Sequence, residues 1–470
     1  MTVTKWILAM LVLATSPGSA LAQSTTAPAL LAPDSRYKAD VLLVVAHPDD
    51  DVVIGAYLAR IALDEHKRVA VVYCTNGDGG GNSVGYVAGH ALGQIREIEA
   101  RRALAAWGIH NVWFLPGHDT PGQNVLRSLD HWNHGLALDE VVRLVRITRP
   151  DVILTWLPDR VVGENHEDHQ ASGVLAVEAF DAAGDPTRFP EQISPALGNM
   201  ANLTEAMLPW QPKKLYFFTD AFEDFGPYWH DPAVKSPYRK SFLDGTGPTY
   251  DATTISTSEH KSYGQLMAEQ QSFYQTQEGD IGDRALKSGK FSEFEYPMHL
   301  IFGKSLVGGA ATGDVFEGIT PGSIPFARVR GYSVEQRDAV TFAIGDSWHF
   351  YSLFWKAHDL DRLATLIPIP EIQADPGERM TIPLSICNHT SVKTDVALKS
   401  TLPPEWKDDS KSTVFPVAPG ECYQIGAQIT PSNAEKTRWH EVTWTATSGS
   451  QTIGSVKVHV YVGQGGGLPQ

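Results

Sequence analysis

Two short segments hold the residues of this chain whose types and spacing could do chemistry. Residues 46–52 read AHPDDDV and follow directly after the apolar run Val41–Val45. Residues 163–169 read GENHEDH and come shortly after a second apolar run, Val152–Trp156. Three adjacent carboxylates repel one another. The first segment is therefore either built around a positive charge or a solvated turn.

A metal ion would supply that charge, because imidazole and carboxylate groups are ligands of Zn²⁺. A catalytic zinc site uses three protein ligands and leaves one position for water. His47, Asp50 and His169 would make such a set. Asp49 would then be available to act as a base toward metal-bound water, whose pKa can fall to roughly 7. Fe²⁺, Co²⁺ and Ni²⁺ accept the same ligands.

Each segment also has a simpler explanation. The first could be a turn in which an aspartate caps the next helix, and the second an exposed helix start. Either segment alone is better explained in this structural way. Together, at the ends of two strands, they favour a metal site.

Alternating strand and helix patterns between residues 40 and 220 must position the two segments. They predict right-handed βαβ units and an α/β fold with a Rossmann-like, mostly parallel sheet flanked by helices. Ligands bind such sheets at the carboxyl ends of the strands, where both segments lie. The expected strands are 41–46, 68–74, 111–115, 151–156 and 214–218, and the expected helices are near 53–65, 93–107, 137–148 and 170–182.

The paired motifs resemble the PIG-L/LmbE-like deacetylase family. That family carries an (A/P)HPDDE motif after its first strand and an HxDH motif after a later one, which here read AHPDDD and HEDH. TNGDGG at 75–80, REIE at 96–99 and RPDVILT at 149–155 resemble further family segments. The resemblance covers residues 40–220 and extends more loosely to about residue 320.

The resemblance implies Zn²⁺ at the ligand set named above and Asp49 as the general base. It implies that His166 acts as general acid or stabilises the oxyanion. Asp168 would orient His166 through a hydrogen bond. The implied reaction is amide hydrolysis, usually removal of acetate from an N-acetylglucosamine unit.

Two positions depart from the family pattern. Asp51 stands where the family usually has Glu, which is one methylene longer, so the hydrogen bond made by that Glu is either lost or remade. Many members also have a late HxSQ segment. The nearest stretch here, KSYGQLMAEQQS at 261–272, contains no histidine. That difference concerns substrate handling and leaves the ligand set intact.

The chain of 470 residues is too long for one ordinary core, so two or three domains are expected. The first is expected at 40–365, with a long insertion at about 183–300. Within the insertion, aromatic residues such as Phe217 and Phe218 either line a sugar-binding cleft or pack the insertion. Short alternating strands at 371–463 predict an all-β, Ig-like sandwich, and the Gly-rich tail 464–470 is expected to be disordered.

The predicted sandwich resembles the Ig-like NEW3 modules of bacterial carbohydrate enzymes. The resemblance lies in segments such as LPPEW at 402–406 and APGE at 418–421. Such a module either binds glycan or only spaces and stabilises. Cys387 and Cys422 in this region either form a disulfide or remain two buried thiols. Cys74, at the end of an apolar run, is expected to be a buried thiol.

The N-terminus predicts export. Lys5 precedes a short apolar stretch, and Ala20-Leu21-Ala22 is a small-x-small cleavage signal. We expect a signal peptide at 1–22 that is cleaved after Ala22, a leader at 23–39, and a periplasmic or extracellular location. The apolar stretch is too short for a comfortable membrane span, and no other run approaches that length.

The predicted function is therefore that of an exported zinc-dependent hydrolase. It would remove an N-acyl group, with acetyl as the expected one, from an N-acetylglucosamine-type sugar or glycoconjugate. One alternative is an amidase of the same fold that acts on a non-sugar amide or thiol conjugate. Another is a catalytically inactive, glycan-binding surface protein. The presence of the predicted ligands and base, His47, Asp49, Asp50 and His169, argues against this alternative. The net charge of −16 argues against a nucleic-acid partner, and the sequence does not indicate an oligomeric state.

Overall fold

The structure is a computed structural model. The predicted signal peptide, residues 23–32 of the leader and the tail 464–470 lie outside the residues that it describes. Among the described helices, none combines the length and the apolar character that a membrane span requires. The described residues are 33–120, 122–159, 166–193, 207–220, 246–333, 339–366, 368–434 and 438–463.

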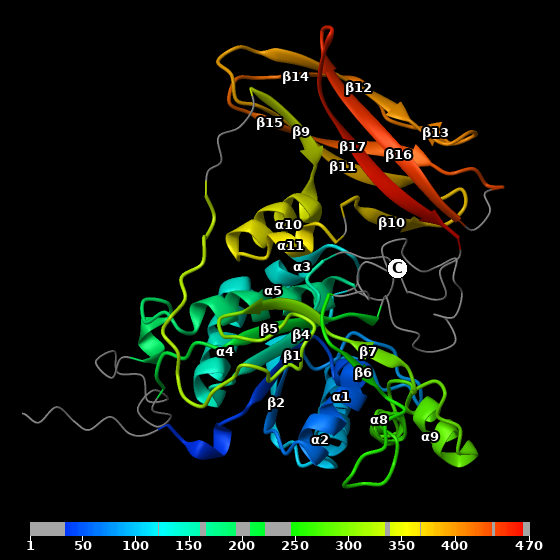
Figure 1. The fold of residues 1–470 in the computed structure, drawn as a ribbon. Helices are drawn as coiled ribbons and strands as arrows, with labels where there is room; N and C mark the ends of the chain where they lie inside the picture. The colour runs from blue at the N-terminus through cyan, green and yellow to red at the C-terminus, as the bar shows by residue number, and fades with distance from the viewer. Residues whose placement is uncertain are drawn as a thin grey trace, which may run out of the picture. The chain divides into compact units, whose positions relative to one another are not determined.

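A six-stranded sheet forms the centre of the first domain (Figure 1). Its strand order is β3-β2-β1-β4-β5-β8, and all neighbouring pairs are parallel except β5 with β8. The prediction of a mostly parallel sheet is confirmed. The strands are β1 (Val41–Val45), β2 (Val69–Thr75), β3 (Asn111–Gly117), β4 (Val152–Trp156), β5 (Lys214–Phe218) and β8 (Ile301–Ser305).

Helices cover both faces of this sheet because its central strands are apolar on both sides. Leu42 and Val44 of β1 face one core, which also contains residues of α4 and α5. Val41, Leu43 and Val45 face the other core, with residues of α1 and α2. Such continuous apolar strands are typical of buried parallel sheets. The helices are α1 (Gly55–Ala59), α2 (His90–Ala105), α3 (Val125–His131), α4 (His134–Thr148) and α5 (Glu167–Ala182).

The predicted insertion contributes to the core. Leu266, Met267 and Tyr274 are buried in the same cluster as α1, and α8 packs against that helix. Phe217 and Phe218 are fully buried residues of β5, so these two aromatic side chains pack the sheet and do not line a cleft. The elements here are β6 (Thr249–Asp251), α8 (Tyr263–Gln271), α9 (Gly279–Ser288) and β7 (Pro297–His299).

The C-terminal part is an all-β sandwich of two sheets, as predicted. The sheet orders are β10-β17-β16-β12-β14 and β13-β15-β11-β9, and alternate residues such as Ile382, Leu384 and Ile386 fill the core between them. The strands are β9 (Val340–Ile344), β10 (Glu371–Ala374), β11 (Met380–Asn388), β12 (Thr394–Thr401), β13 (Lys407–Asp408), β14 (Val414–Val417), β15 (Cys422–Thr430), β16 (Arg438–Ser448) and β17 (Gln451–Val462).

One strand of the sandwich comes from the range predicted for the first domain. β9 pairs with β11, and it is followed by α10 (Asp346–Ala357) and α11 (Asp361–Ala364). Trp348 of α10 packs against the sandwich core, whereas Tyr351 on the same helix belongs to the α/β core. The chain therefore contributes to the sandwich before residue 371.

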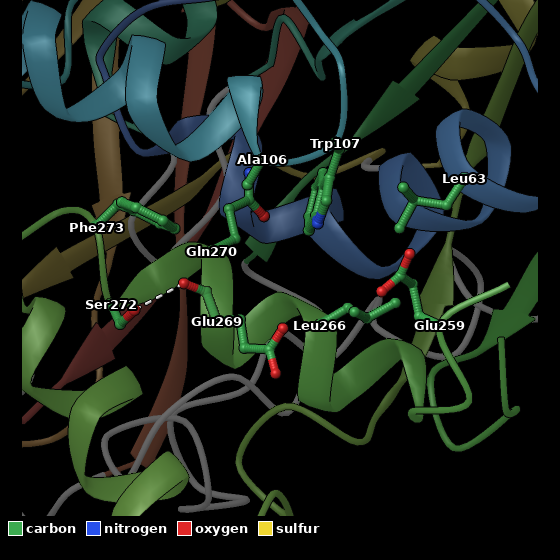
Figure 2. Close-up of a pocket in the computed structure, with 9 residues that line it drawn as sticks. All are labelled: Leu63, Ala106, Trp107, Glu259, Leu266, Glu269, Gln270, Ser272 and Phe273. Carbon is green, nitrogen blue, oxygen red and sulfur yellow. Dashed lines mark hydrogen bonds between the residues drawn. The ribbon is translucent and has the colours of Figure 1, made fainter.

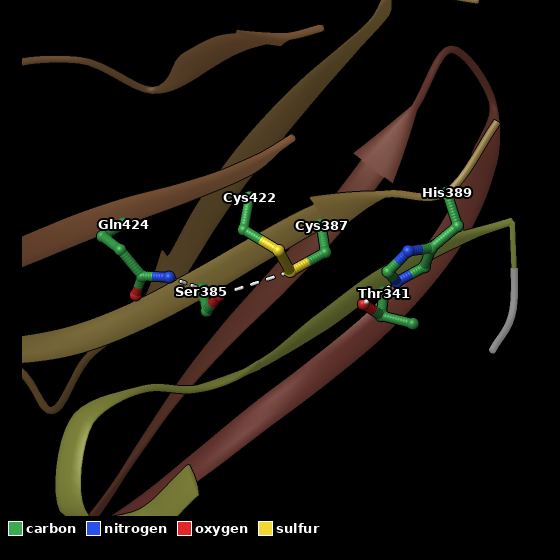
Figure 3. Close-up of a disulfide and its surroundings, with 6 residues drawn as sticks. All are labelled: Thr341, Ser385, Cys387, His389, Cys422 and Gln424. Atoms are coloured by element: carbon green, nitrogen blue, oxygen red, sulfur yellow. Dashed lines mark hydrogen bonds between the residues drawn. A yellow bond between two sulfur atoms is a disulfide. The ribbon is translucent and has the colours of Figure 1, made fainter. Parts of the chain in front are cut away.

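The cysteines of the sandwich form a disulfide, which the sequence had left open. Cys387 and Cys422 are direct partners in the β11–β15 register, with their Cα atoms 4.0 Å apart (Figure 3). Cys74 is a buried free thiol, as expected. Burial raises the pKa of that thiol well above its ordinary value, so it is chemically quiet.

Candidate metal centre

The carboxyl ends of β1 and β4 bring the two motif segments together. β1 ends at Val45, and the turn that follows leads into a 3₁₀ helix, Asp50–Ile54. After β4, the chain returns to the same edge at His166, which is the N-cap of α5. Residues 163–165 of the second motif lie outside the described part of the chain. His47, Asp50, His166, Asp168 and His169 form one cluster, in which His166 is half-buried and the others are buried.

Asp50 lies at the centre of this cluster with its carboxylate fixed from one side. Its Oδ2 accepts hydrogen bonds from the backbone N–H of Ala46 at 2.8 Å and of His47 at 3.0 Å, and from Trp156 Nε1 at 2.7 Å. Its Oδ1 lies 3.1 Å from His169 Nε2 and 3.5 Å from His47 Nδ1. One oxygen of Asp50 therefore reaches both predicted histidine ligands. The groups whose ligand atoms all lie within 4.8 Å of one another are different ones among the described residues: His47, His166 and His169, and His47, Asp119 and Asp168.

The charge balance around Asp50 favours its ionised form. Burial by itself raises the pKa of a carboxyl group, but the neighbouring imidazoles of His169 and His47 outweigh burial here. They hold the pKa of Asp50 well below its ordinary value. An ionised, buried carboxylate beside two imidazoles is the donor chemistry of a zinc site.

The imidazole ring of His166 lies next to the rings of both predicted histidine ligands. Its ring centroid is 4.0 Å from that of His169 and 5.0 Å from that of His47. One nitrogen from each of the three rings falls within 4.8 Å of the others, which makes them a possible ligand group. His169 also stacks on Trp156 at 3.9 Å. Burial, then the neighbouring His169 and His47, lower the pKa of His166 well below its ordinary value.

The Asp168 carboxylate lies beside His47. Its Oδ2 lies 3.3 Å from His47 Nε2 and accepts the N–H of Thr120 at 2.7 Å. Its Oδ1 accepts from Ser128 Oγ at 2.5 Å. Only the backbone N–H of Asp168 reaches His166, donating to Nδ1 at 3.4 Å. The carboxylate therefore contacts His47, whereas the hydrogen bond to His166 comes from the Asp168 backbone. The predicted role of Asp168 in orienting His166 stays a prediction.

Asp119 is a site residue that sequence reasoning missed. Its Oδ1 lies 3.8 Å from His47 Nε2 and accepts from Thr75 Oγ1 at 2.5 Å, while Oδ2 accepts the N–H of Gly79 at 3.0 Å. Burial lowers the pKa of His47, but the carboxylates of Asp119, Asp168 and Asp50 outweigh burial and hold it well above its ordinary value. The available signal was its place two residues after β3, at the edge of the sheet where both motifs lie.

Asp49, the predicted base, has an unusual backbone. Its φ is 116° and its ψ is −22°, in the left-handed range that non-glycine residues seldom adopt. Its neighbour Pro48 is held by a hydrogen bond from Gln277 Nε2 to the Pro48 carbonyl. Strained residues of this kind persist where the surrounding structure fixes them, and they cluster at functional sites.

Asp51 belongs to a separate buried network. Tyr73 Oη donates to its Oδ1 at 2.6 Å, and Tyr274 Oη lies 2.7 Å from Oδ1 and 2.8 Å from Oδ2. Gln270 Nε2 donates to Oδ2. Burial raises the pKa of Asp51 to about 6, although the tyrosine hydrogen bonds oppose this. Gln270 of α8 and Tyr274 of the turn after it therefore bond Asp51, although this side chain is one methylene shorter than the Glu of the family pattern.

The Arg96 and Glu99 motif on α2 holds neighbouring loops in place. Arg96 donates to the carbonyls of Gly77 and Gly81, each at 2.6 Å. Glu99 accepts from the N–H of Thr276 at 3.0 Å and from its hydroxyl at 2.6 Å. This motif fixes the Gly-rich loop after β2 and the turn after α8, which borders Pro48.

A pocket of about 300 Å³ lies beside α8 (Figure 2). α8 and the two residues after it line one side, and the rest is lined by the residues that follow α2, by the helical segment Arg60–Asp64 after α1, and by Glu259. None of its lining residues is a motif histidine or aspartate, although Gln270 also bonds Asp51. The lining residues are Leu63, Ala106, Trp107, Glu259, Leu266, Glu269, Gln270, Ser272 and Phe273.

The described cluster falls inside a segment that is similar to known proteins. Residues 42–180 match the PIG-L family, whose model is described as GlcNAc-PI de-N-acetylase. 1D-myo-inositol 2-acetamido-2-deoxy-alpha-D-glucopyranoside deacetylase 1 of Frankia alni is 34% identical over 187 residues, which are 36% of this chain and 59% of that protein. The deacetylase of the same description from Geodermatophilus obscurus is 36% identical over 169 residues, or 32% and 56%. The chain therefore spans less than two thirds of either relative.

Among solved structures, N,N'-diacetylchitobiose deacetylase from Pyrococcus horikoshii is 16% identical to this chain. The superposition has a TM-score of 0.39 and covers 56% of this chain and 83% of that one. Conserved protein TT1542 from Thermus thermophilus is 18% identical, with a TM-score of 0.36 and coverage of 58% and 97%.

Proposed function

We propose that this chain is an exported, zinc-dependent hydrolase that removes the acetyl group from an N-acetylglucosamine-type sugar or glycoconjugate. The observation that carries the proposal is the cluster of two buried imidazoles and one half-buried imidazole with Asp50 and Asp168, inside the segment that matches the de-N-acetylase family. The two curated relatives are named as deacetylases of a 2-acetamido-2-deoxy-glucopyranoside. Their names support an N-acetylated glucosamine unit as the substrate class.

The donor set fits Zn²⁺. His47, Asp50 and His169 would hold the ion, because one Asp50 oxygen is fixed by three N–H donors and the other faces an imidazole nitrogen from each histidine. Two imidazoles and a carboxylate are a common set for catalytic zinc. When bound, Zn²⁺ polarises the substrate carbonyl and lowers the pKa of water to roughly 7.

The other residues of the cluster have proton-handling and orienting roles in this proposal. Asp49 takes a proton from the attacking water, and its left-handed backbone conformation is of the strained kind that clusters at functional sites. His166 Nδ1 accepts the N–H of Asp168, so a neutral ring carries its proton on Nε2. That N–H can donate to the amide oxygen as negative charge develops there. Asp168, itself fixed by Thr120 and Ser128, orients His47.

The proposal of export rests on two features of the chain. The first is the predicted signal peptide at residues 1–22. The second is the Cys387–Cys422 disulfide, because structural disulfides are typical of oxidising compartments outside the cytosol. Secretion of the full-length chain, followed by N-terminal sequencing of the mature product, tests the cleavage after Ala22.

Metal content and acetate release, measured on one preparation, test the enzymatic proposal. The mature chain is purified, its metals are quantified by mass spectrometry, and acetate is measured with N-acetylglucosamine and its oligomers, with and without chelator. We expect about one zinc per chain and chelator-sensitive acetate release. Metal without acetate release from any of these sugars would contradict the substrate class. A chain that stays metal-free after zinc is added would contradict the site.

Asp49→Asn separates the base from the metal. We expect turnover to fall by about 10²- to 10⁴-fold, the usual contribution of a general base, with zinc content unchanged. Asn tolerates a positive φ better than most residues, so the backbone is preserved. Asp49→Gly is the matched control, because Gly relieves the strain and also lacks the carboxylate. If either variant retains wild-type turnover, Asp49 is not the base.

A further inference from the structure

An exposed, uncharged segment follows β2. Residues 79–89 read GGGNSVGYVAG and contain no charged side chain. Val84, Tyr86 and Val87 are exposed by 62%, 104% and 43%. A single exposed apolar residue needs no explanation, but three within four positions, including a fully exposed tyrosine, indicate a contact surface.

The turn that carries these side chains, residues 82–87, is held in shape by its own hydrogen bonds. The N–H of Val84 donates to Asn82 Oδ1 at 3.1 Å, and Asn82 Nδ2 donates to the carbonyl of Val87 at 3.0 Å. Asn82 therefore ties both ends of the turn. Tyr86 is presented to solvent from a fixed backbone, which reduces the entropy lost when a partner binds.

The base of this turn borders the candidate active site. The N–H of Ser83 donates to the carbonyl of Thr276 at 3.1 Å, and the next residue, Gln277, donates to the carbonyl of Pro48. Pro48 lies between His47 and Asp49. On the other side, the N–H of Gly79 donates to Asp119, which lies beside His47. The turn is thus attached to Thr276, the residue before Gln277, which bonds Pro48, and Gly79, one of the glycines that lead into the turn, is attached to Asp119.

We propose that Tyr86, flanked by Val84 and Val87, is a stacking platform for the sugar ring next to the N-acetylated unit. An aromatic face packs against the apolar C–H face of a pyranose, and the uncharged turn suits a neutral saccharide. The inference rests on the proposed function and deepens it. It makes the preferred substrate a disaccharide or longer saccharide, with one ring at the metal centre and the next on Tyr86.

The test compares substrates of different length in the full mature chain. The probes are N-acetylglucosamine and its β-1,4-linked dimer and trimer. In Tyr86→Ala, we expect the ratio of kcat/KM for the dimer to kcat/KM for the monosaccharide to fall about tenfold, which corresponds to about 1.4 kcal/mol. Tyr86→Phe keeps the aromatic face and should keep the ratio. Because Tyr86 is fully exposed, neither variant threatens the fold.

Tyr423→Ala is the matched control, since it removes an exposed tyrosine from β15 of the sandwich. We expect this variant to keep the wild-type ratio. A ratio that is unchanged in Tyr86→Ala, or that falls equally in Tyr423→Ala, overturns the platform. If light scattering shows that Tyr86→Ala dissolves a wild-type dimer while the ratio is unchanged, the turn is a contact between copies and the proposal is overturned.

Calorimetric binding of the same sugars separates this inference from the proposed function. If wild type releases no acetate but binds the dimer, and Tyr86→Ala binds it about tenfold more weakly, the proposed function fails and the platform stands. If wild type releases acetate but the Tyr86 variants match it on every probe, the platform fails and the proposed function stands. A chain that binds no saccharide contradicts both.

Discussion

Tyr274→Phe removes one hydroxyl from the buried network around Asp51. The Tyr274 side chain is fully buried, and its hydroxyl lies within hydrogen-bond distance of both oxygens of Asp51, at 2.7 and 2.8 Å. A hydrogen bond to a charged group contributes roughly 1.5–3 kcal/mol to stability. At about pH 8 Asp51 is ionised, since its pKa is about 6. We therefore expect the free energy of unfolding of the α/β part to fall by about 2 kcal/mol.

Urea unfolding of the full chain, followed by tryptophan fluorescence, measures this loss as a shift in midpoint at constant slope. Tyr216→Phe is the matched control. Tyr216 is equally buried, and its hydroxyl has no hydrogen-bond partner among the described residues. Its removal should change the free energy of unfolding by less than about 0.5 kcal/mol, because no bond is lost.

The network also predicts that the effects of two tyrosine substitutions on the free energy of unfolding do not simply add. Tyr73 donates to the same Asp51 oxygen at 2.6 Å. Among the described residues, Tyr73→Phe combined with Tyr274→Phe leaves the buried carboxylate with Gln270 as its side-chain donor. Coupling between residues that share one partner is typically about 0.5–3 kcal/mol, and the double variant should lose more than the sum of the single ones. The reasoning is refuted if Tyr274→Phe behaves like Tyr216→Phe, or if the two tyrosine losses simply add.

Two further predictions concern stability away from the site. His134 Nε2 lies 2.5 Å from a carboxylate oxygen of Glu178, and this hydrogen bond raises the pKa of His134 despite burial. The stabilisation that the pair gives the folded state is therefore present below the pKa of His134 in the unfolded chain. It is lost as the pH rises through the pKa of His134 in the folded protein. The His134 side chain is 40% exposed, so the pair contributes little. In urea unfolding, His134→Gln should lower the free energy of unfolding by at most about 1 kcal/mol at about pH 5.5 and by nearly nothing at about pH 9. An equal loss at both pH values would refute the pairing. Replacing Cys387 and Cys422 by Ser opens a disulfide loop with a sequence separation of 35, which should lower sandwich stability by about 2–4 kcal/mol; an unchanged urea midpoint would show that the bond does not stabilise the domain.

The α/β sheet could be predicted because its strands have a simple signal. Val41–Val45 and Val152–Trp156 are apolar almost throughout and buried on both faces, as is typical of a parallel sheet covered by helices. β8 was missed because Ile301–Ser305 contains glycine and lysine and lies at the edge of the sheet. Its strand conformation depends on pairing with β5 and not on local composition.

The candidate site contains a contact that the family resemblance did not imply. The resemblance implied that Asp168 orients His166, which lies two residues before it. At the start of a helix, however, residues i and i+2 point in different directions. The Asp168 carboxylate therefore turns toward His47, which is 121 residues away in sequence. Asp119 also reaches His47 from a distant part of the chain, and the signal for it in the sequence is its place two residues after β3.

The boundary between the two domains could not be predicted from the sequence, because it also depends on contacts between distant parts of the chain. Residues 367–370 look like a linker, yet the chain enters the sandwich earlier, as β9, and then leaves it along α10. One face of α10 sets Trp348 against the sandwich core, while Tyr351 donates to Gln170 at 2.7 Å. Gln170 is the neighbour of His169 on α5. A helix shared by two cores carries no local sign of which one it serves, because an apolar side chain gains the same free energy of burial in either core. The boundary therefore follows from the tertiary pairing of β9 with β11, which no stretch of sequence between residues 340 and 370 encodes by itself.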